Sequence, residues 1–136
     1  MQDIKIIDGI ISYRIIDIGE GYEISREYNN HLLDGVSIEK KYYIRKNEYC
    51  VNPSVIKTMH YKRGLKSGIW TYENKLTGRM VLFEYKNGIK NGKYIHQYLL
   101  DRRTGYYKDG LKDGTFIREY DRTVTTKKYK CRNYKN

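Results

Sequence analysis

The chain has 136 residues, with 27 Lys or Arg against 16 Asp or Glu and a net charge of +11 at pH 7. This length suits one domain that folds without disulfides or metal ions. Cys50, Cys131 and three scattered histidines match no zinc-binding spacing, so we expect a reduced chain with no metal or cofactor. No stretch reaches the roughly 20 apolar residues of a membrane span, and the N-terminus lacks the pattern of a secretion signal. A soluble, intracellular protein is the expectation.

Tyrosine dominates the apolar part of the composition. The chain holds 16 Tyr against 2 Phe, and hydrophobic residues make up only 39% of it. A tyrosine ring buries area while its hydroxyl stays in water. The composition therefore predicts a thin core built from tyrosine rings, as in a sheet with one layer or a lightly covered face.

Residues 1–27 contain two isoleucine-rich runs, 4–7 and 10–18, separated by Asp8-Gly9. Alternation in the second run and the Asp-Gly turn predict a hairpin that caps the fold. Isoleucine at successive positions indicates either burial on both faces or an edge that pairs with another chain.

A ten-residue pattern then recurs along the chain: aromatic, Lys, polar, Gly, Leu or Ile, Lys, polar, Gly, any residue, aromatic. Copies begin at Tyr61, Tyr85 and Tyr107, and a degenerate copy with His31 in the first glycine column begins at Tyr28. The tyrosines are 33, 24 and 22 residues apart. Repeats of this length indicate an array of similar structural units, which we place at 28–60, 61–84, 85–106 and 107–122, with an insertion loop at 47–53 in the first.

The glycines of the pattern predict tight reversals between strands. Asn87-Gly88 and Asp109-Gly110 are turn dipeptides because both residue types tolerate positive φ, and alternating apolar and polar residues flank them. A phosphate-binding loop is disfavoured, because no helix follows and no Gly-Lys-Ser/Thr ending is present. The apolar residue between the glycines is expected to fold inward. The predicted structural turn glycines are Gly35, Gly64, Gly68, Gly88, Gly92, Gly110 and Gly114.

After Tyr120 the alternation resumes over residues 123–130, which we predict to form a terminal edge strand before a basic tail. Lys127, Lys128 and Lys130 would discourage further strand addition. The expected fold is all-β: an elongated, twisted antiparallel meander of stacked β-hairpins.

The unit resembles the MORN repeat, whose consensus runs aromatic-x-Asn/Asp-Gly-x-x-x-Gly followed two residues later by an aromatic residue or glycine. The segments 85–94 and 107–116 match best, and Gly105 fits a further glycine of that family's strand. The aromatic endings Trp70, Tyr94 and Phe116 are closer to the divergent variant in bacterial antitoxin-like and giant-virus proteins. The resemblance covers residues 28–132 and implies stacked hairpins that act as a spacer, dimerisation module or adaptor. Together with the Ile, Lys, Tyr and Asn bias of an AT-rich genome, it suggests a viral origin, in the host cytoplasm or the virion.

Charge is divided unevenly along the chain. Residues 1–53 carry 7 basic and 9 acidic residues, whereas residues 54–136 carry 20 and 7. Basic residues recur in the predicted turns, so stacking the units would line them along one rim. Such a rim suits an anionic partner, but it could equally serve only to keep a thin sheet soluble.

Four classes of function follow from these features. A repeat scaffold that binds a protein or a second copy through its tyrosine-rich sheet comes first. Binding of single-stranded nucleic acid by the basic C-terminal half and of an anionic membrane by the rim are alternatives. An enzyme is expected least, because no nucleophile elbow, HExxH or P-loop occurs, and neither a catalytic residue nor a small-molecule substrate is assigned. The candidate partner-binding residues are Tyr61, Lys66, Trp70, Tyr85, Lys90, Tyr94, Tyr107, Lys112, Phe116, Lys127 and Lys128.

Overall fold

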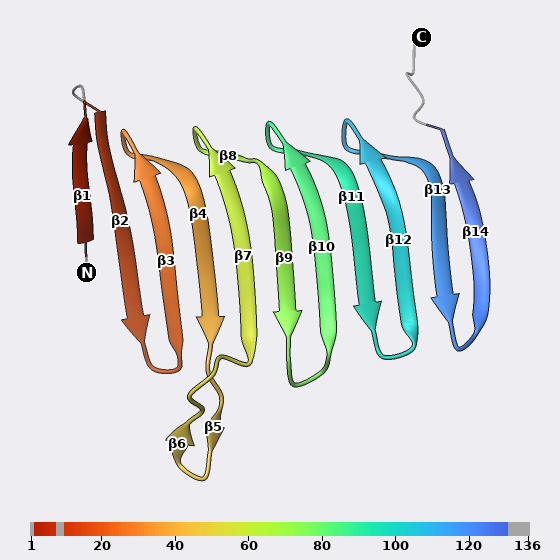
Figure 1. Ribbon diagram of the computed structural model, residues 1–136, viewed down its shortest axis with the longest axis horizontal. Coiled ribbons are helices and arrows are strands. Elements are labelled where there is room, and N and C mark those ends of the chain that lie inside the picture. The colour runs from red at the N-terminus through yellow and green to blue at the C-terminus, as the bar shows by residue number, and fades with distance from the viewer. Residues whose placement is uncertain (1, 8–9, 131–136) are drawn as a thin grey trace.

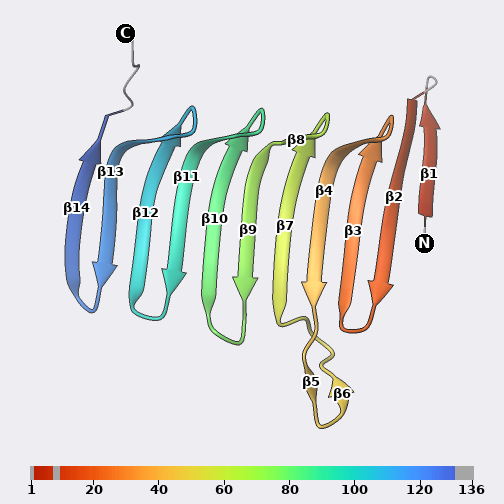
Figure 2. The ribbon, with the colours of Figure 1, turned by 180° about the vertical axis from the view of Figure 1, so that it is seen from behind.

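The computed structural model describes residues 2–7 and 10–130, and these residues form one open antiparallel sheet (Figures 1 and 2). Eleven strands lie side by side, mostly in chain order, and successive strands are joined as hairpins in a meander that does not close into a barrel. The sheet consists of β1 (Gln2–Ile7), β2 (Ile10–Gly19), β3 (Tyr22–Asn29), β4 (Leu32–Lys41), β7 (Val55–Lys62), β9 (Gly68–Asn74), β10 (Arg79–Lys86), β11 (Ile89–Tyr98), β12 (Asp101–Lys108), β13 (Leu111–Tyr120) and β14 (Thr123–Tyr129). The predicted all-β meander is confirmed.

The two ends of the sheet are formed by the N-terminal hairpin and by the last strand. β1 and β2 form the N-terminal hairpin and β1 is an edge strand; β14 is the other edge. The short β8 (Leu65–Lys66) pairs with β7 at one turn. The insertion begins earlier than the predicted loop at 47–53: between β4 and β7 the chain forms a small hairpin, β5 (Ile44–Arg45) and β6 (Glu48–Tyr49), which extends beyond the lower end of the sheet in Figure 1.

The repeated glycines supply left-handed backbone at each reversal. All seven predicted turn glycines have positive φ, from 71° at Gly68 to 119° at Gly92. His31, in the glycine column of the degenerate copy, also has positive φ (66°), as do Asn87 and Asp109 (both 50°). Such conformations favour glycine, asparagine and aspartate, although Arg63 occupies the same column as Asn87 and Asp109 in the copy that begins at Tyr61, also with a φ of 50°.

The sheet has two chemically different faces. Residues directly opposite one another on neighbouring antiparallel strands point to the same side, so the strand registers divide the side chains. The side that we call the aromatic face carries Tyr61, Trp70, Phe83, Tyr85, Tyr94, Tyr107, Phe116 and Tyr129. The other side, the aliphatic face, carries one unbroken row from β2 to β14: Ile16, Ser25, Ile38, Thr58, Thr71, Leu82, Ile95, Thr104, Ile117 and Thr126.

No second layer covers either face in the described part of the chain (Figures 1 and 2). The buried hydrophobic residues among those described are Val55 and Met59, 8% and 6% exposed. Most domains bury their sheets against another layer, and this one packs mainly within each face. The same residues include no helix long and apolar enough to cross a membrane.

The apolar residue between the two turn glycines behaves differently from the prediction. Leu32, Leu65, Ile89 and Leu111 remain about half exposed and do not fold inward. Leu65 instead contacts the turn glycine of the following unit, Gly88, whose amide donates a hydrogen bond to the Lys66 carbonyl (2.9 Å). The reason is geometric: successive turns are adjacent along one rim, so each apolar side chain packs on its neighbouring turn.

Candidate interaction face

Aromatic rings form a continuous ladder across the C-terminal half of the aromatic face. Trp70 lies between Tyr61 and Tyr85, with ring centroids 5.2 and 5.1 Å away. Phe83 and Tyr94 continue the ladder at 5.0 Å, and Phe116 and Tyr129 end it at 5.1 Å. Several pairs meet edge to face, the arrangement that ring quadrupoles favour. The ladder links units that are neighbours in space, so it stabilises the array as a whole.

A glycine lies opposite the first tyrosine of each following unit. The register pairs Gly35 with Tyr61, Gly68 with Tyr85, Gly92 with Tyr107, and Gly114 with Tyr129. Gly105 is needed for a different reason, because a Cβ at this position would lie 2.5 Å from the Phe116 ring. Phe116 therefore packs against bare backbone, which explains the glycine within this strand.

One lysine of each full copy lies over the rings. The Lys66 ammonium is 4.8 Å from the Trp70 ring centroid and 5.2 Å from that of Tyr85. Lys90 bridges Phe83 and Tyr107 at 4.1 and 5.2 Å, and Lys112 bridges Phe116 and Tyr129 at 5.3 and 5.0 Å. Cation–π attraction therefore holds each of these lysines on the aromatic face, across the boundary between two units.

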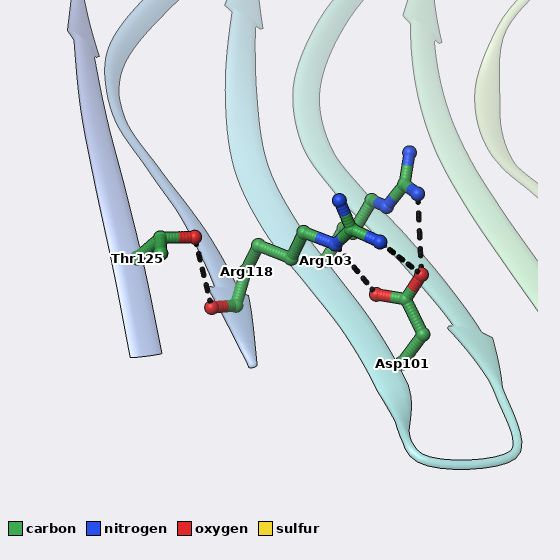
Figure 3. A network of polar contacts seen from close by, with 4 residues as sticks. All are labelled: Asp101, Arg103, Arg118 and Thr125. Carbon is green, nitrogen blue, oxygen red and sulfur yellow. Dashed lines mark hydrogen bonds and ion pairs between the residues drawn. The ribbon is translucent and has the colours of Figure 1, made fainter. Parts of the chain in front are cut away.

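An arginine-rich network continues the positive charge toward the lower end of this face (Figure 3). Asp101 accepts hydrogen bonds from Arg103 (3.1 Å) and, through both carboxylate oxygens, from Arg118 (3.2 and 3.1 Å). Its side chain is only 17% exposed, whereas the two arginines are 43% and 50% exposed. One carboxylate thus positions two guanidinium groups that remain accessible to a partner.

Between the ladder and this network lies a shallow hollow of about 500 Å³. Its lining includes four basic residues, Arg103, Lys112, Arg118 and Lys127, together with rings of Tyr94, Phe116 and Tyr129. Basic and aromatic groups at one concave surface suit an anionic group attached to an apolar body.

Burial and charge shift several pKa values on this face. Burial raises the pKa values of Tyr61, Tyr85, Tyr94 and Tyr107. Burial, with the nearby Arg103 and Arg79, lowers the pKa of His96. Hydrogen bonds from Arg103 and Arg118 lower the pKa of Asp101.

The two faces differ in charge as well as in apolar character. Between the turns, the aromatic face carries Arg26, Lys41, Lys57, Arg79, Arg103, Arg118 and Lys127 against Asp17, Glu39 and Asp101. Lys66, Lys90 and Lys112 add three more positive charges. The aliphatic face is closer to neutral, with Arg14, Lys40, Lys93, Arg102 and Lys128 against Glu23, Glu27, Glu73, Glu84 and Glu119. At the strand ends, Lys62, Lys86 and Lys108 lie on this side against Asp113.

The structure brings ten of the eleven candidate partner-binding residues to the aromatic face. Lys128 is the exception: it lies opposite Thr115 on the other side of the sheet, because it neighbours Lys127 in an extended strand. Lys66, Lys90 and Lys112 lie over the rings, whereas Lys62, Lys86 and Lys108 lie beside the turns.

Sequence analysis missed the Asp101 network and a recurring glutamate. Glu27 and Glu84 each directly precede a pattern tyrosine, and each Oε2 accepts a hydrogen bond from a backbone amide, of Val36 (3.2 Å) and Lys93 (3.0 Å). Both lie at register shifts in the hairpins, where an amide lacks its ladder partner. The recurrence of Glu before Tyr in two copies was the available signal.

In the comparisons with known proteins, no protein family and no curated protein matches this chain.

Proposed function

We propose that the protein is a non-enzymatic repeat scaffold that binds an acidic segment of another protein across its aromatic face. The observation that carries the proposal is the placement of Lys66, Lys90 and Lys112 over the ring ladder, one lysine to each unit. A partner with carboxylates at matching intervals meets these ammonium groups and the Arg103–Arg118 pair on one surface. The resemblance to MORN arrays, which serve as adaptors, agrees with this role.

The contacts already made by the ring faces favour an acidic protein segment over single-stranded nucleic acid as the partner. Base stacking needs an open ring face, and lysine ammonium groups already lie over Trp70, Phe83 and Phe116. Neighbouring rings contact one another edge to face, as Tyr94 and Tyr107 do at 89°. Carboxylates, in contrast, need only the exposed cations.

The test compares two triple variants with the same change in net charge. Lys66, Lys90 and Lys112 are replaced by Gln in one variant, and the turn residues Lys62, Lys86 and Lys108 in the other. Fluorescence anisotropy follows the binding of labelled poly-glutamate at about 50 mM salt. We expect the first variant to bind at least tenfold more weakly than the second. Equal losses, or a larger loss in the turn variant, would move the site to the rim and overturn the proposal.

A further inference from the structure

The aliphatic face lies on the opposite side of the sheet from the aromatic face, and no second layer covers it in the described part of the chain. The chain exposes 10473 Å², whereas a compact monomer of its 16.3 kDa exposes about 7,500 Å², so the excess is about 3,000 Å². A stable protein–protein interface buries about 1,600 Å² in total. The excess thus exceeds what one such interface removes from water.

The row from Ile16 to Thr126 has the composition of a sheet face that packs on another sheet. Its members are Ile, Leu, Thr and one Ser, and they cross ten strands without interruption. Ile69 and Tyr106, 45% and 55% exposed, lie on the same side. Two sheets that pack face to face at about 10 Å interlock such rows of large and small side chains.

We infer that a second copy of this chain covers the aliphatic face, so that two sheets pack back to back in a dimer. The charges on the two faces favour a second copy of the chain as the partner on the aliphatic face. With the strand ends included, the aliphatic face carries eight Lys or Arg against six Asp or Glu, whereas the aromatic face carries ten against three, so a second identical aliphatic face meets far less repulsion. The aromatic face, with its excess of cations, would repel a copy of itself. The dimer would therefore leave both aromatic faces outward and open to partners.

Self-association is also consistent with the small number of buried residues. Val55 and Met59 are the buried hydrophobic residues among those described, a small core for one domain. Apolar burial contributes about 25 cal/mol per Å², and a face-to-face contact would supply the layer that the monomer lacks. This inference does not depend on the proposed acidic partner, because the two surfaces lie on opposite sides of the sheet.

The test measures the solution mass of the full chain by sedimentation equilibrium between about 1 and 100 μM. We expect a mass twice the 16.3 kDa of one chain. Thr71→Glu with Thr104→Glu places two carboxylates in the centre of the aliphatic face and is expected to give monomers. Thr123→Glu, on the aromatic side of β14, places a carboxylate on the opposite face as a control and should remain dimeric. Circular dichroism verifies that each variant is folded.

A wild-type chain that stays monomeric at 100 μM would overturn the inference. So would a Thr123→Glu chain that dissociates while the folded double variant does not. Should the double variant unfold, chemical cross-linking settles the question. With Cys50 and Cys131 replaced by Ser, a bismaleimide with an arm of about 10 Å, the spacing of packed sheets, should join two Thr71→Cys chains and should not join two Thr123→Cys chains. The reverse pattern, or equal cross-linking, counts against the back-to-back dimer. Poly-glutamate binding by the monomeric double variant should be unchanged, which separates this inference from the proposed function.

Discussion

Gly92 lies directly opposite Tyr107 in the register of β11 and β12, and its φ is +119°. A Cβ on Gly92 would collide with the carboxylate of Glu84 on the aliphatic side of the sheet. The glycine therefore meets two demands: its backbone reaches a conformation that other residues avoid, and it leaves room for the glutamate that caps the Lys93 amide. This relationship links the recurring glycine to the recurring glutamate.

Replacing Gly92 by alanine should destabilise the protein by about 1–3 kcal/mol, the cost of a strained left-handed backbone together with a displaced Glu84. Gly78→Ala is the control, because Gly78 also has positive φ (75°) but nothing lies within 4 Å of the added Cβ. We expect the control to cost about 1 kcal/mol. Urea unfolding measures both. Equal losses of stability in the two variants would show that contact with Glu84 adds nothing to the cost of a side chain at position 92.

Removing the Glu84 carboxylate should cost about 0.5–1.5 kcal/mol, since the Lys93 amide at the register shift loses its acceptor. Glu84→Gln keeps an oxygen acceptor and should recover most of that loss. Glu73→Ala, on the same face and exposed, is the matched control and should change the free energy of unfolding by less than about 0.5 kcal/mol. A Glu84→Ala chain as stable as the control would disprove the capping role.

Asp101→Asn should strengthen the binding of acidic ligands several-fold, because it removes the carboxylate that pairs with Arg103 and Arg118. Glu119→Gln makes the same change in net charge on the aliphatic face and should have a much smaller effect. Poly-glutamate anisotropy at fixed salt compares the two. If both variants bind equally well, only net charge matters and the arginine pair is not part of the site.

The lowered pKa of Asp101 also predicts how stability depends on pH. An acid whose pKa is lower in the folded chain stabilises that state above its unfolded pKa of about 3.8. This contribution is lost as the pH falls through the lower folded value. Acid titrations of wild type and Asp101→Asn should therefore converge below that folded value and diverge above about pH 4. Parallel curves over the whole range would contradict the shift.

The pKa of His96 can be used to test whether an acidic ligand binds on the aromatic face. Its pKa is lowered by burial and by Arg103 and Arg79, so protonation should destabilise the fold as the pH falls below the unfolded value of about 6.5. An acidic ligand beside Arg103 should raise this pKa, because it neutralises the positive charge nearby. NMR of the imidazole protons with and without poly-glutamate measures the change. An unchanged or lowered value in the presence of bound ligand would place that ligand elsewhere.

An oligothymidylate of about 20 nucleotides and an abasic strand of the same length should bind with similar affinity. Stacking contributes about 1–3 kcal/mol per base where ring faces are open, and here lysines lie over Trp70, Phe83 and Phe116. Anisotropy at matched salt gives both affinities. A thymidylate strand that binds more than tenfold tighter would restore nucleic acid as the favoured partner.

The strand–turn–strand units were predictable from sequence because glycine, asparagine and aspartate at fixed offsets determine where the backbone reverses. The placement of Lys90 could also have been predicted: Lys90 and Tyr94 are an even number of residues apart, so alternation puts both on one side of the strand. Charge alone does not use this parity, so the prediction of a basic rim did not separate lysines on the aromatic face from those beside the turns. The pairing of Asp101 with Arg118, 17 residues away, depends on the hairpin register and its bulge, which local pattern does not specify. The inward folding of Leu65 was wrong because the next turn, not a core, receives it.

The most direct test of the two-faced sheet is an NMR titration of the wild-type chain with poly-glutamate, monitored at side-chain resonances of both faces. We expect shifts at the Trp70 indole, the His96 ring and the ammonium-bearing carbons of Lys66, Lys90 and Lys112. Resonances of Ile95, Ile117 and Lys93 on the aliphatic face should remain unchanged. Shifts spread equally over both faces, or confined to Lys62, Lys86 and Lys108 at the turns, would contradict it.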